Sequence, residues 1–395
     1  MTYILRETGT AADLDALNNA WLQEETFVFM PSKSSVDEAD VLGVLEHLPV
    51  AMRSEHFILL TSGSTGLPKM VVGARSRAEA LAQQLHIQQN SEAVSAAILA
   101  LPLSYCYSFV NQWLWSRVHE RDVVYTKGLG DPAALQNVLA TAESTMLCFV
   151  GSQLGMLLPG WGSAVFPNVL RVHFAGGRFP QQHLGVLTER FPNAKIYNNY
   201  GCAEAMPRLT LRPAEAHPEA SNIGWPLDGI ELSIGENGNL RFRSPFGAVA
   251  QQIGDQFEVL DQSGWMETGD LAVQEPDGSI RLLGRSNEVF KRFGEKVSLS
   301  ALLDTVRSAG WLAGAHFVTK EDSQGETGYV LVLEGAPENA TVRQILRAFR
   351  ASYSRSLWPL AIESVDSIPL LGNGKIDALA LAYQTDSVTH WKNRI

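Results

Sequence analysis

Short apolar runs alternate with longer amphipathic stretches along the first two thirds of the chain. Runs of this length that are bounded by polar or turn-forming residues are typical of buried strands, and apolar residues at helical spacing predict helices between them. Strands are predicted at 59–60, 96–101, 123–125, 146–150 and 169–174, with helices at 77–89 and 133–142. The alternation favours an α/β fold with a mixed or parallel sheet.

The pattern changes between residues 223 and 283, where short strands are separated by Gly, Asp and Asn turns. This region is predicted to form a small antiparallel subdomain. Mixed α/β signals return after residue 285, with strands and helices expected from about 300 to 353. We therefore predict a large N-terminal domain at 1–285 and a small α/β C-terminal domain at 286–395.

Composition and charge exclude several classes of protein. Hydrophobic residues make up 45% of the 395 positions and the formal net charge is −11, which argues against a nucleic-acid surface. Residues 286–395 hold 12 basic and 12 acidic side chains, so residues 1–285 carry the whole negative charge. The three cysteines are isolated, and neither an export signal nor a membrane span is apparent, so we expect a cytoplasmic protein.

A loop rich in hydroxyl groups and glycine follows the apolar run 57–60. Its glycines permit close backbone approach and its lysine supplies a cation, as a polyphosphate site requires; the candidate residues are Thr61, Ser62, Gly63, Ser64, Thr65, Gly66 and Lys69. Pro68 stands before the lysine, so the loop differs from the Gly-Lys-Ser/Thr loop of P-loop NTPases. It resembles the phosphate loop of the adenylate-forming superfamily, which includes acyl-CoA synthetases and the adenylation domains of peptide synthetases.

Two further segments carry the same resemblance in the nucleotide half. Segment 197–204 resembles the superfamily's Tyr-Gly-x-Thr-Glu motif, with Ala203 in place of threonine as in aryl-acid-activating members that load carrier proteins. The resemblance implies that Tyr200 stacks on adenine, that Glu204 binds Mg²⁺, and that the glycine pair of segment 175–180 lies beside the base. The remaining nucleotide-binding candidates are Asn198, Asn199, Gly201, Gly176 and Gly177.

Three segments near the second domain complete the resemblance. Segment 264–271 matches Gly-Trp-x-x-Thr-Gly-Asp, which implies that Asp270 accepts hydrogen bonds from the ribose hydroxyls. Segment 284–297 resembles the hinge motif, with Arg285 on the nucleotide, Asn287 as pivot, and Lys291 and Lys296 facing the acceptor. The glycine turn 369–377 resembles the catalytic loop that carries Lys375.

These resemblances together imply a two-step reaction, with residues 1–285 as the adenylation domain and residues 286–395 as a small mobile domain that carries Lys375. A carboxylate attacks the α-phosphate of MgATP to give an acyl-adenylate and pyrophosphate, and a thiol of CoA or of a carrier protein's phosphopantetheine then displaces AMP. Lys69, Glu204 and Lys375 are the implied catalytic residues. Two alternatives stay open at this point: an amine or another non-thiol acceptor, and a non-catalytic binding paralogue.

The sequence signals for the acyl pocket and for the acceptor are less specific than those for the nucleotide site. Segment 102–109 resembles the superfamily's acyl-side motif, with Tyr105 in place of histidine; Tyr105, Tyr107, Asn111 and Ala175 are the expected pocket residues, and their aromatic character favours an aryl or hydrophobic acid. Only about sixty residues precede the phosphate loop, and apolar surface left by this short front favours a homodimer. Arg343, Arg347 and Arg350 recur at helical spacing, so they predict a basic face that docks an acidic acyl carrier protein.

Overall fold

The computed structural model describes residues 2–34, 36–61, 69–261, 263–286, 289–292, 295–322, 327–371 and 376–393. The chain forms two compact units, one of Met1–Ser233 with Arg241–Thr268 and the other of Ile234–Leu240 with Gly269–Ile395. The second unit thus includes residues 269–285, which the sequence assigned to the large domain. The pivot after residue 285 stays a prediction.

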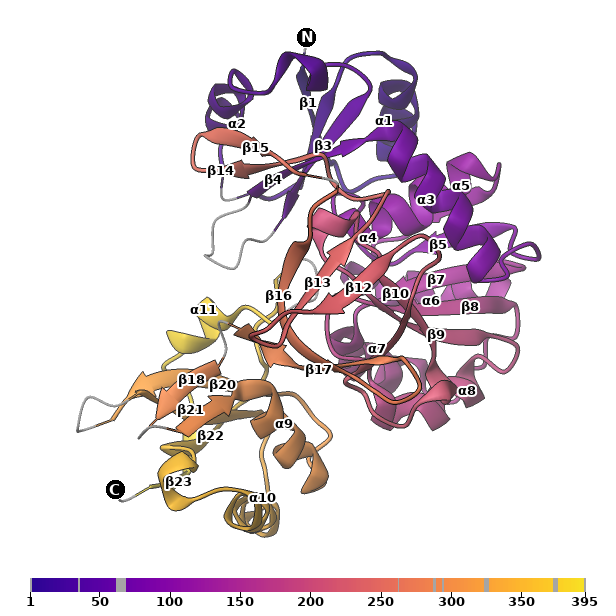
Figure 1. Ribbon diagram of the computed structural model, residues 1–395. Coiled ribbons are helices and arrows are strands. Elements are labelled where there is room, and N and C mark those ends of the chain that lie inside the picture. The colour runs from indigo at the N-terminus through magenta and orange to yellow at the C-terminus, as the bar shows by residue number, and fades with distance from the viewer. Residues whose placement is uncertain are drawn as a thin grey trace. The chain divides into compact units, whose positions relative to one another are not determined.

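The first sheet of the larger unit combines the N-terminus with a much later hairpin. Strands β1 (Tyr3–Arg6), β2 (Phe27–Met30) and β3 (His56–Thr61) are parallel, and β4 (Lys69–Ala74) returns antiparallel to β3. The hairpin of β14 (Ala250–Ile253) and β15 (Gln256–Val259) extends this sheet beside β4 (Figure 1). Helices α1 (Ala12–Leu22) and α2 (Glu38–Leu45) connect its first three strands. The predicted antiparallel region therefore shares strands with this sheet.

A second sheet in the same unit carries the strands predicted at 96–101, 123–125, 146–150 and 169–174, while the strand predicted at 59–60 is part of β3 in the first sheet. Its order includes β11 (Asn222–Pro226), β10 (Thr210–Pro213), β9 (Lys195–Tyr200), β8 (Val169–Phe174), β7 (Thr145–Phe149), β5 (Ala96–Leu99) and β6 (Asp122–Tyr125). The strands from β9 to β6 are parallel, and every residue of β5 and β7 is buried. Helices α6 (Pro132–Thr141), α7 (Leu154–Trp161) and α8 (Leu184–Arg190) connect parallel strands. Continuous burial of this kind is expected when helices cover both faces of a parallel sheet.

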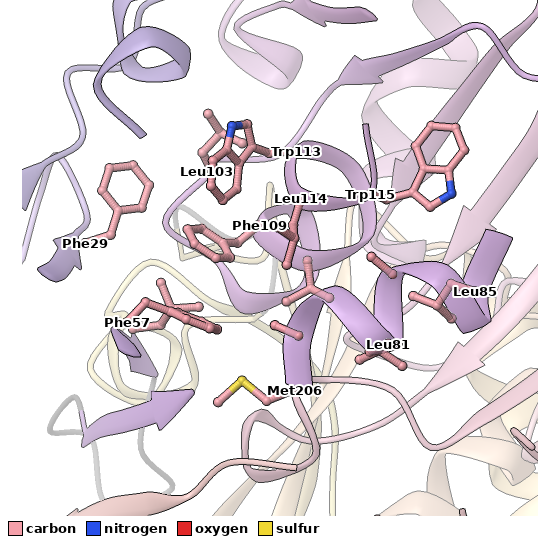
Figure 2. Packing of buried hydrophobic residues seen from close by; sticks show 14 of the residues in the cluster. Phe29, Phe57, Leu81, Leu85, Leu103, Phe109, Trp113, Leu114, Trp115 and Met206 are labelled. Carbon is pink, nitrogen blue, oxygen red and sulfur yellow. The ribbon is translucent and has the colours of Figure 1, made fainter. Parts of the chain in front are cut away.

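An aromatic cluster fills the core next to these sheets. Helix α4 (Cys106–Ser108), the π-helix η2 (Phe109–Leu114) and α5 (Trp115–Val118) form one continuous helical segment. Figure 2 shows this segment carrying Phe109, Trp113 and Trp115 into the cluster, where Trp113 and Trp115 are at most 1% exposed. Helix α3 (Arg75–Gln88) supplies Leu81 and Leu85 to the same cluster. The segment after Tyr105 is therefore helical, and its middle is π-helical, a conformation that is rare overall and frequent at functional sites.

The smaller unit is also α/β. Strands β16 (Met266–Gln274) and β17 (Ile280–Arg285) pair antiparallel, as do β18 (Val289–Arg292) and β19 (Glu295–Ser298). A four-stranded sheet, β20 (Ala315–Glu321), β21 (Thr327–Glu334), β22 (Ala361–Val365) and β23 (Val388–Lys392), packs with α9 (Leu299–Ser308) and α10 (Asn339–Ser352), and α11 (Ala378–Ala382) follows the catalytic-loop segment. Strands β12 (Glu231–Ile234) and β13 (Asn239–Arg243) precede β16 in strand order. The predicted α/β class is confirmed. No helix in the described part of the chain has both the length and the apolar character needed to cross a membrane.

Candidate active site

The predicted phosphate loop connects two antiparallel strands. Thr61, the last residue of β3, pairs in register with Lys69, the first residue of β4, and both are half-buried. The predicted residues Ser62, Gly63, Ser64, Thr65 and Gly66 lie outside the described residues. The hairpin thus fixes both ends of the loop, one at a hydroxyl and the other at a cation.

A tight turn follows β9 and carries the predicted Mg²⁺ ligand. Gly201 lies so close to Pro207 that a Cβ built on it would sit 1.7 Å from the Pro207 carbonyl oxygen, and Met206 adopts a left-handed conformation with φ of 55°. The turn closes where Leu209 N–H donates to the Tyr200 carbonyl at 2.8 Å. The Glu204 carbonyl accepts from Ala248 N–H at 2.8 Å, so the backbone of this acidic residue is fixed while its side chain stays half-buried.

A buried polar network joins the end of β9 to the acyl-side helix. Asn199 Nδ2 donates to the Tyr107 hydroxyl at 3.0 Å, and Arg208 donates to Asn199 Oδ1 at 2.9 Å and to Asn111 Oδ1 at 2.5 Å. Asn199, Asn111 and Arg208 are at most 4% exposed. The structure therefore brings the predicted acyl residues Tyr107 and Asn111 together with a residue of the predicted nucleotide strand.

Two members of this network, Arg208 and His173, were missed by the sequence motifs. Asn199 Nδ2 also lies 3.3 Å from His173 Nδ1, and the His173 ring stacks on Tyr197 with centroids 5.2 Å apart. Burial, and then the Arg208 and Arg171 guanidinium groups, hold the pKa of His173 well below its usual range, so its imidazole is neutral. An ionisable side chain inside an otherwise apolar run was the available signal for both residues.

Glu7 holds the start of the acyl-side segment and was also missed. Its two carboxylate oxygens accept from Leu103 N–H and Ser104 Oγ–H, each at 2.6 Å, and the residue is 4% exposed. Burial raises the pKa of this carboxyl group, although the bonds from Ser104 and Leu103 oppose the rise. Burial also raises the pKa of the adjacent predicted pocket residue Tyr105, with a smaller contribution from Glu7.

The acyl-pocket candidate Ala175 and the remaining nucleotide candidates of the larger unit lie at the same ends of the parallel strands. Ala175 follows β8 and its N–H donates to the Phe149 carbonyl at 3.1 Å; Gly176, with φ of 75°, and Gly177 are exposed beyond it. Asn198 Nδ2 donates to the Asn222 carbonyl at 3.0 Å and is buried. Because ligands of α/β sheets bind beyond the carboxyl ends of strands, this edge is where a nucleotide is expected.

The smaller unit places two of its predicted residues in direct contact. Asp270 and Arg285 are opposite each other in the β16–β17 register, and Arg285 Nε lies 2.9 Å from Asp270 Oδ1. Lys291 and Lys296 are opposite each other between β18 and β19. The predicted pivot Asn287 and catalytic Lys375 lie outside the described residues.

A protein-family model described as AMP-binding enzyme matches residues 6–246. The chain belongs to the family of AMP-binding enzymes. The adenylate-forming resemblance drawn from the sequence motifs is therefore confirmed.

Curated AMP-binding relatives are similar over most of this chain. The L-proline–[L-prolyl-carrier protein] ligase of Pseudomonas fluorescens is 24% identical over 84% of this chain and 68% of its own. The long-chain-fatty-acid–CoA ligase of Yersinia pestis is 24% identical over 81% of this chain and 60% of its own. A much larger relative, a plipastatin synthase of Bacillus subtilis, is 25% identical over 84% of this chain, which spans only 14% of that synthase.

Solved structures share the fold along nearly the whole chain. The o-succinylbenzoate-CoA synthetase of Bacillus subtilis, in complex with its acyl-adenylate intermediate, has a TM-score of 0.77 at 18% identity and covers 97% of this chain and 88% of its own. The anthranilate-CoA ligase solved with anthranoyl-AMP has a TM-score of 0.71 at 16% identity, with 96% and 77% coverage. At these identities the likeness shows the fold of an AMP-binding enzyme.

Proposed function

We propose that this protein activates a carboxylic acid with ATP and transfers the acyl group to a thiol. In the first step an oxygen of the acid attacks the α-phosphorus and pyrophosphate leaves, which gives an acyl-adenylate. In the second step a pantetheine sulfur attacks the acyl carbonyl carbon, AMP leaves, and the thiol proton is lost. The thiol belongs to CoA or to a carrier protein.

The observation that carries this proposal is the position of Asn199. This residue precedes Tyr200, the proposed adenine contact, and its side chain binds the hydroxyl group of Tyr107, a proposed acyl-pocket residue. Candidate residues of the nucleotide and acyl halves thus belong to one buried network at the carboxyl edge of a parallel sheet, which supports a reaction between the two substrates there. The family match and the shared fold support the same chemistry.

The nucleotide contacts follow from the same proposal. The hydroxyl-rich loop and Lys69 bind the phosphates, Tyr200 stacks on adenine, and Asp270 with Arg285 holds the ribose. Glu204 suits Mg²⁺, because that ion prefers carboxylate oxygen and is commonly held by one or two carboxylates together with substrate phosphates. Bound Mg²⁺ would screen the phosphate charge.

The small C-terminal domain supplies the catalytic lysine in this proposal. Lys375 stabilises negative charge in the first step, and rotation about Asn287 then brings the face with Lys291 and Lys296 to the acceptor. Such a rotation allows the domain to exclude water from the site during adenylation and to open the site to the thiol afterwards.

Carboxylate-dependent pyrophosphate exchange over a panel of acids tests the first step. Exchange with at least one acid is expected, and its absence with every acid would favour a binding paralogue. Parallel assays with CoA, a phosphopantetheinylated carrier protein and simple amines then identify the acceptor class. Lys375→Ala should reduce exchange far more than it reduces transfer from a supplied acyl-adenylate.

A carrier protein is the acceptor that the surface of the smaller unit favours. Residues 339–362 contain four arginines and no acidic residue in a chain of net charge −11. Arg343, Arg347 and Arg350 are exposed on α10, as the sequence predicted. A cavity of about 690 Å³ beside them is lined by Arg350, Arg355, Trp358, Trp391, Lys392 and Asn393.

The chemistry of this cavity suits an acidic partner with an apolar anchor. The Arg350 guanidinium lies over the Trp358 ring at 5.2 Å, and the Trp358 indole N–H donates to the Tyr353 carbonyl at 3.1 Å. Among the described residues, the cavity lining therefore offers cations and indole surface and contains no carboxylate side chain. Charge complementarity of this kind favours docking of an acidic carrier protein.

A further inference from the structure

Arg208 is an arginine at 0% exposure that forms no ion pair with any acidic side chain of the described residues. Its guanidinium group donates hydrogen bonds to the side-chain amide oxygens of Asn111 and Asn199. When the Gln89 side-chain amide is rotated so that its oxygen faces Arg208, this oxygen is a third acceptor at 3.0 Å. Amide oxygens accept hydrogen bonds but do not neutralise the positive charge. Burying a guanidinium without a counter-ion is costly, so its presence in the core calls for an explanation.

A second buried arginine, four residues further along the chain, has a structural role and serves as a comparison for Arg208. Arg212, also 0% exposed, donates to the backbone carbonyls of Ala214 and His217 and to Gln181 Oε1. It thereby closes the turn after β10, and Glu215 lies near enough to favour its charge. Arg208 has no comparable acidic neighbour and binds side chains that we assign to the substrate pocket.

The Arg208 network also contains polar atoms without partners. His173 Nε2 is buried and has no hydrogen-bond partner within the described part of the chain. Arg208 Nε also has none there, but Arg212 Nε shares that property, so the two arginines differ in their charge partners and not at Nε. Arg208 and His173 lie at the carboxyl end of the parallel sheet, where the proposed acyl pocket is. Tyr107, which accepts from Asn199, is half-buried, whereas Asn199, Arg208 and His173 are buried. An acceptor atom delivered beside Tyr107 would satisfy a buried donor, and a carboxylate would in addition balance the guanidinium charge.

We propose that this network forms the inner end of the acyl pocket and that Arg208 selects acids whose tail carries a hydrogen-bond acceptor. A hydroxyl group, a keto group or a second carboxylate would serve. The inference rests on the proposed function and narrows it, because a purely aliphatic tail would leave His173 Nε2 without a hydrogen-bond partner and the Arg208 charge without a counter-ion. An aryl acid is compatible when its ring bears such a group.

The test compares acids that differ only at the tail, by pyrophosphate exchange in the full chain. Suitable pairs are butyrate with 3-hydroxybutyrate, hexanoate with 5-oxohexanoate, pentanoate with glutarate, and benzoate with 3-hydroxybenzoate. The wild-type protein should prefer the acceptor-bearing member of at least one pair by roughly tenfold or more in kcat/KM, since a site built to bond a substrate group rejects the analogue that lacks it. Arg208→Met should abolish that preference while the KM for ATP changes less than about twofold.

Arg212 provides the matched control, because it is equally buried and lies four residues away. Arg212→Lys should lower the unfolding midpoint as Arg208→Lys does, yet keep the acid preference. If Arg208→Met does not fold, Arg208→Lys still tests the inference, because the lysine keeps the charge but loses the two-point contact.

The inference fails if the wild type prefers the unsubstituted acids or if the preference survives both Arg208 variants. Absence of exchange with every acid would instead overturn the proposed function. The two failures are therefore distinguishable.

Discussion

Arg285 Nε lies 2.9 Å from the Asp270 carboxylate, directly across the β16–β17 strand pair. The aspartate side chain is 8% exposed and the arginine side chain is 48% exposed, so the pair presents the arginine outward and orients the carboxylate. Asp270 and Arg285 belong to separate sequence motifs, and the β16–β17 register brings their side chains into contact.

Asp270→Asn should raise the KM for ATP by about tenfold, equivalent to about 1.4 kcal/mol of binding energy. The amide keeps the shape of the side chain but loses one acceptor and the charge that orients Arg285. Asp277→Asn is the control, because Asp277 caps a turn by accepting from Ser279 in the same unit. Equal effects of the two variants on the KM for ATP would contradict a nucleotide role for Asp270.

Gly201→Ala should lower the free energy of unfolding by about 3 kcal/mol and remove most adenylation activity. The added methyl group would lie 1.7 Å from the Pro207 carbonyl oxygen, so the turn that carries Glu204 must open. Gly185→Ala on α8 meets nothing within 4 Å and should stabilise the helix by up to about 1 kcal/mol. Urea unfolding of both variants checks the prediction, which a fully stable and active Gly201→Ala protein would refute.

Stability should fall as the pH drops below about 6.5, the usual pKa of an unfolded histidine. The rings of His86 and His119 stack with centroids 4.0 Å apart, and burial lowers the pKa of both side chains, with His119 also lowering that of His86. A depressed histidine pKa means that the unfolded state takes up more protons, so the stabilisation is complete above the unfolded pKa and is lost below it. His119→Gln should flatten the decline in urea midpoints between about pH 7.5 and about pH 5.5. An unchanged slope in this variant would assign the decline to other groups.

Glu7→Ala should cost about 3 kcal/mol of stability and raise the KM for the acid more than the KM for ATP. The substitution leaves Leu103 N–H and Ser104 Oγ–H without their acceptor at the start of the acyl-side segment. Glu7→Gln keeps one acceptor oxygen and should recover part of both losses. A rise in the KM for ATP alone would show that this segment does not shape the acyl pocket.

Reversing Arg343, Arg347 and Arg350 to glutamate should raise the apparent KM for a carrier protein at least about tenfold and leave pyrophosphate exchange intact. Lys33, Lys127 and Lys195, which are exposed elsewhere, provide a triple reversal with the same change in net charge. That control should load the carrier normally at matched ionic strength. Unchanged loading by the arginine variant would move the docking site away from α10.

The sequence predicted the strands and helices of the larger unit well because each of their apolar runs is typical of a single kind of element. The runs at 146–150 and 169–174 became the buried strands β7 and β8, since parallel strands covered on both faces need continuous apolar residues. The sheet that β14 and β15 join was not predictable, because the local sequence pattern does not reveal which distant strand a hairpin will pair with. Asn199 and Tyr107 were each proposed as site residues, yet their contact depends on the packing of a helix against a strand end.

Arg208, His173 and Glu7 were missed for a different reason. Each is a single ionisable residue with no motif of its own, and its role follows only from burial and from the atoms it meets. Local sequence patterns report periodicity and turn chemistry, while a buried charge is defined by neighbours that are distant along the chain.

The path of the chain between the two compact units limits how they can be produced separately. The chain changes unit after Ser233, after Leu240 and after Thr268, the last change falling within strand β16. A recombinant fragment that begins at Gly269 would therefore lack the 234–240 segment of its own unit, and a fragment that ends at Thr268 would carry that segment as a foreign insertion. Similarly, one proteolytic cut at residue 268 would leave the 234–240 segment covalently attached to the larger unit, so the two products would remain associated through it.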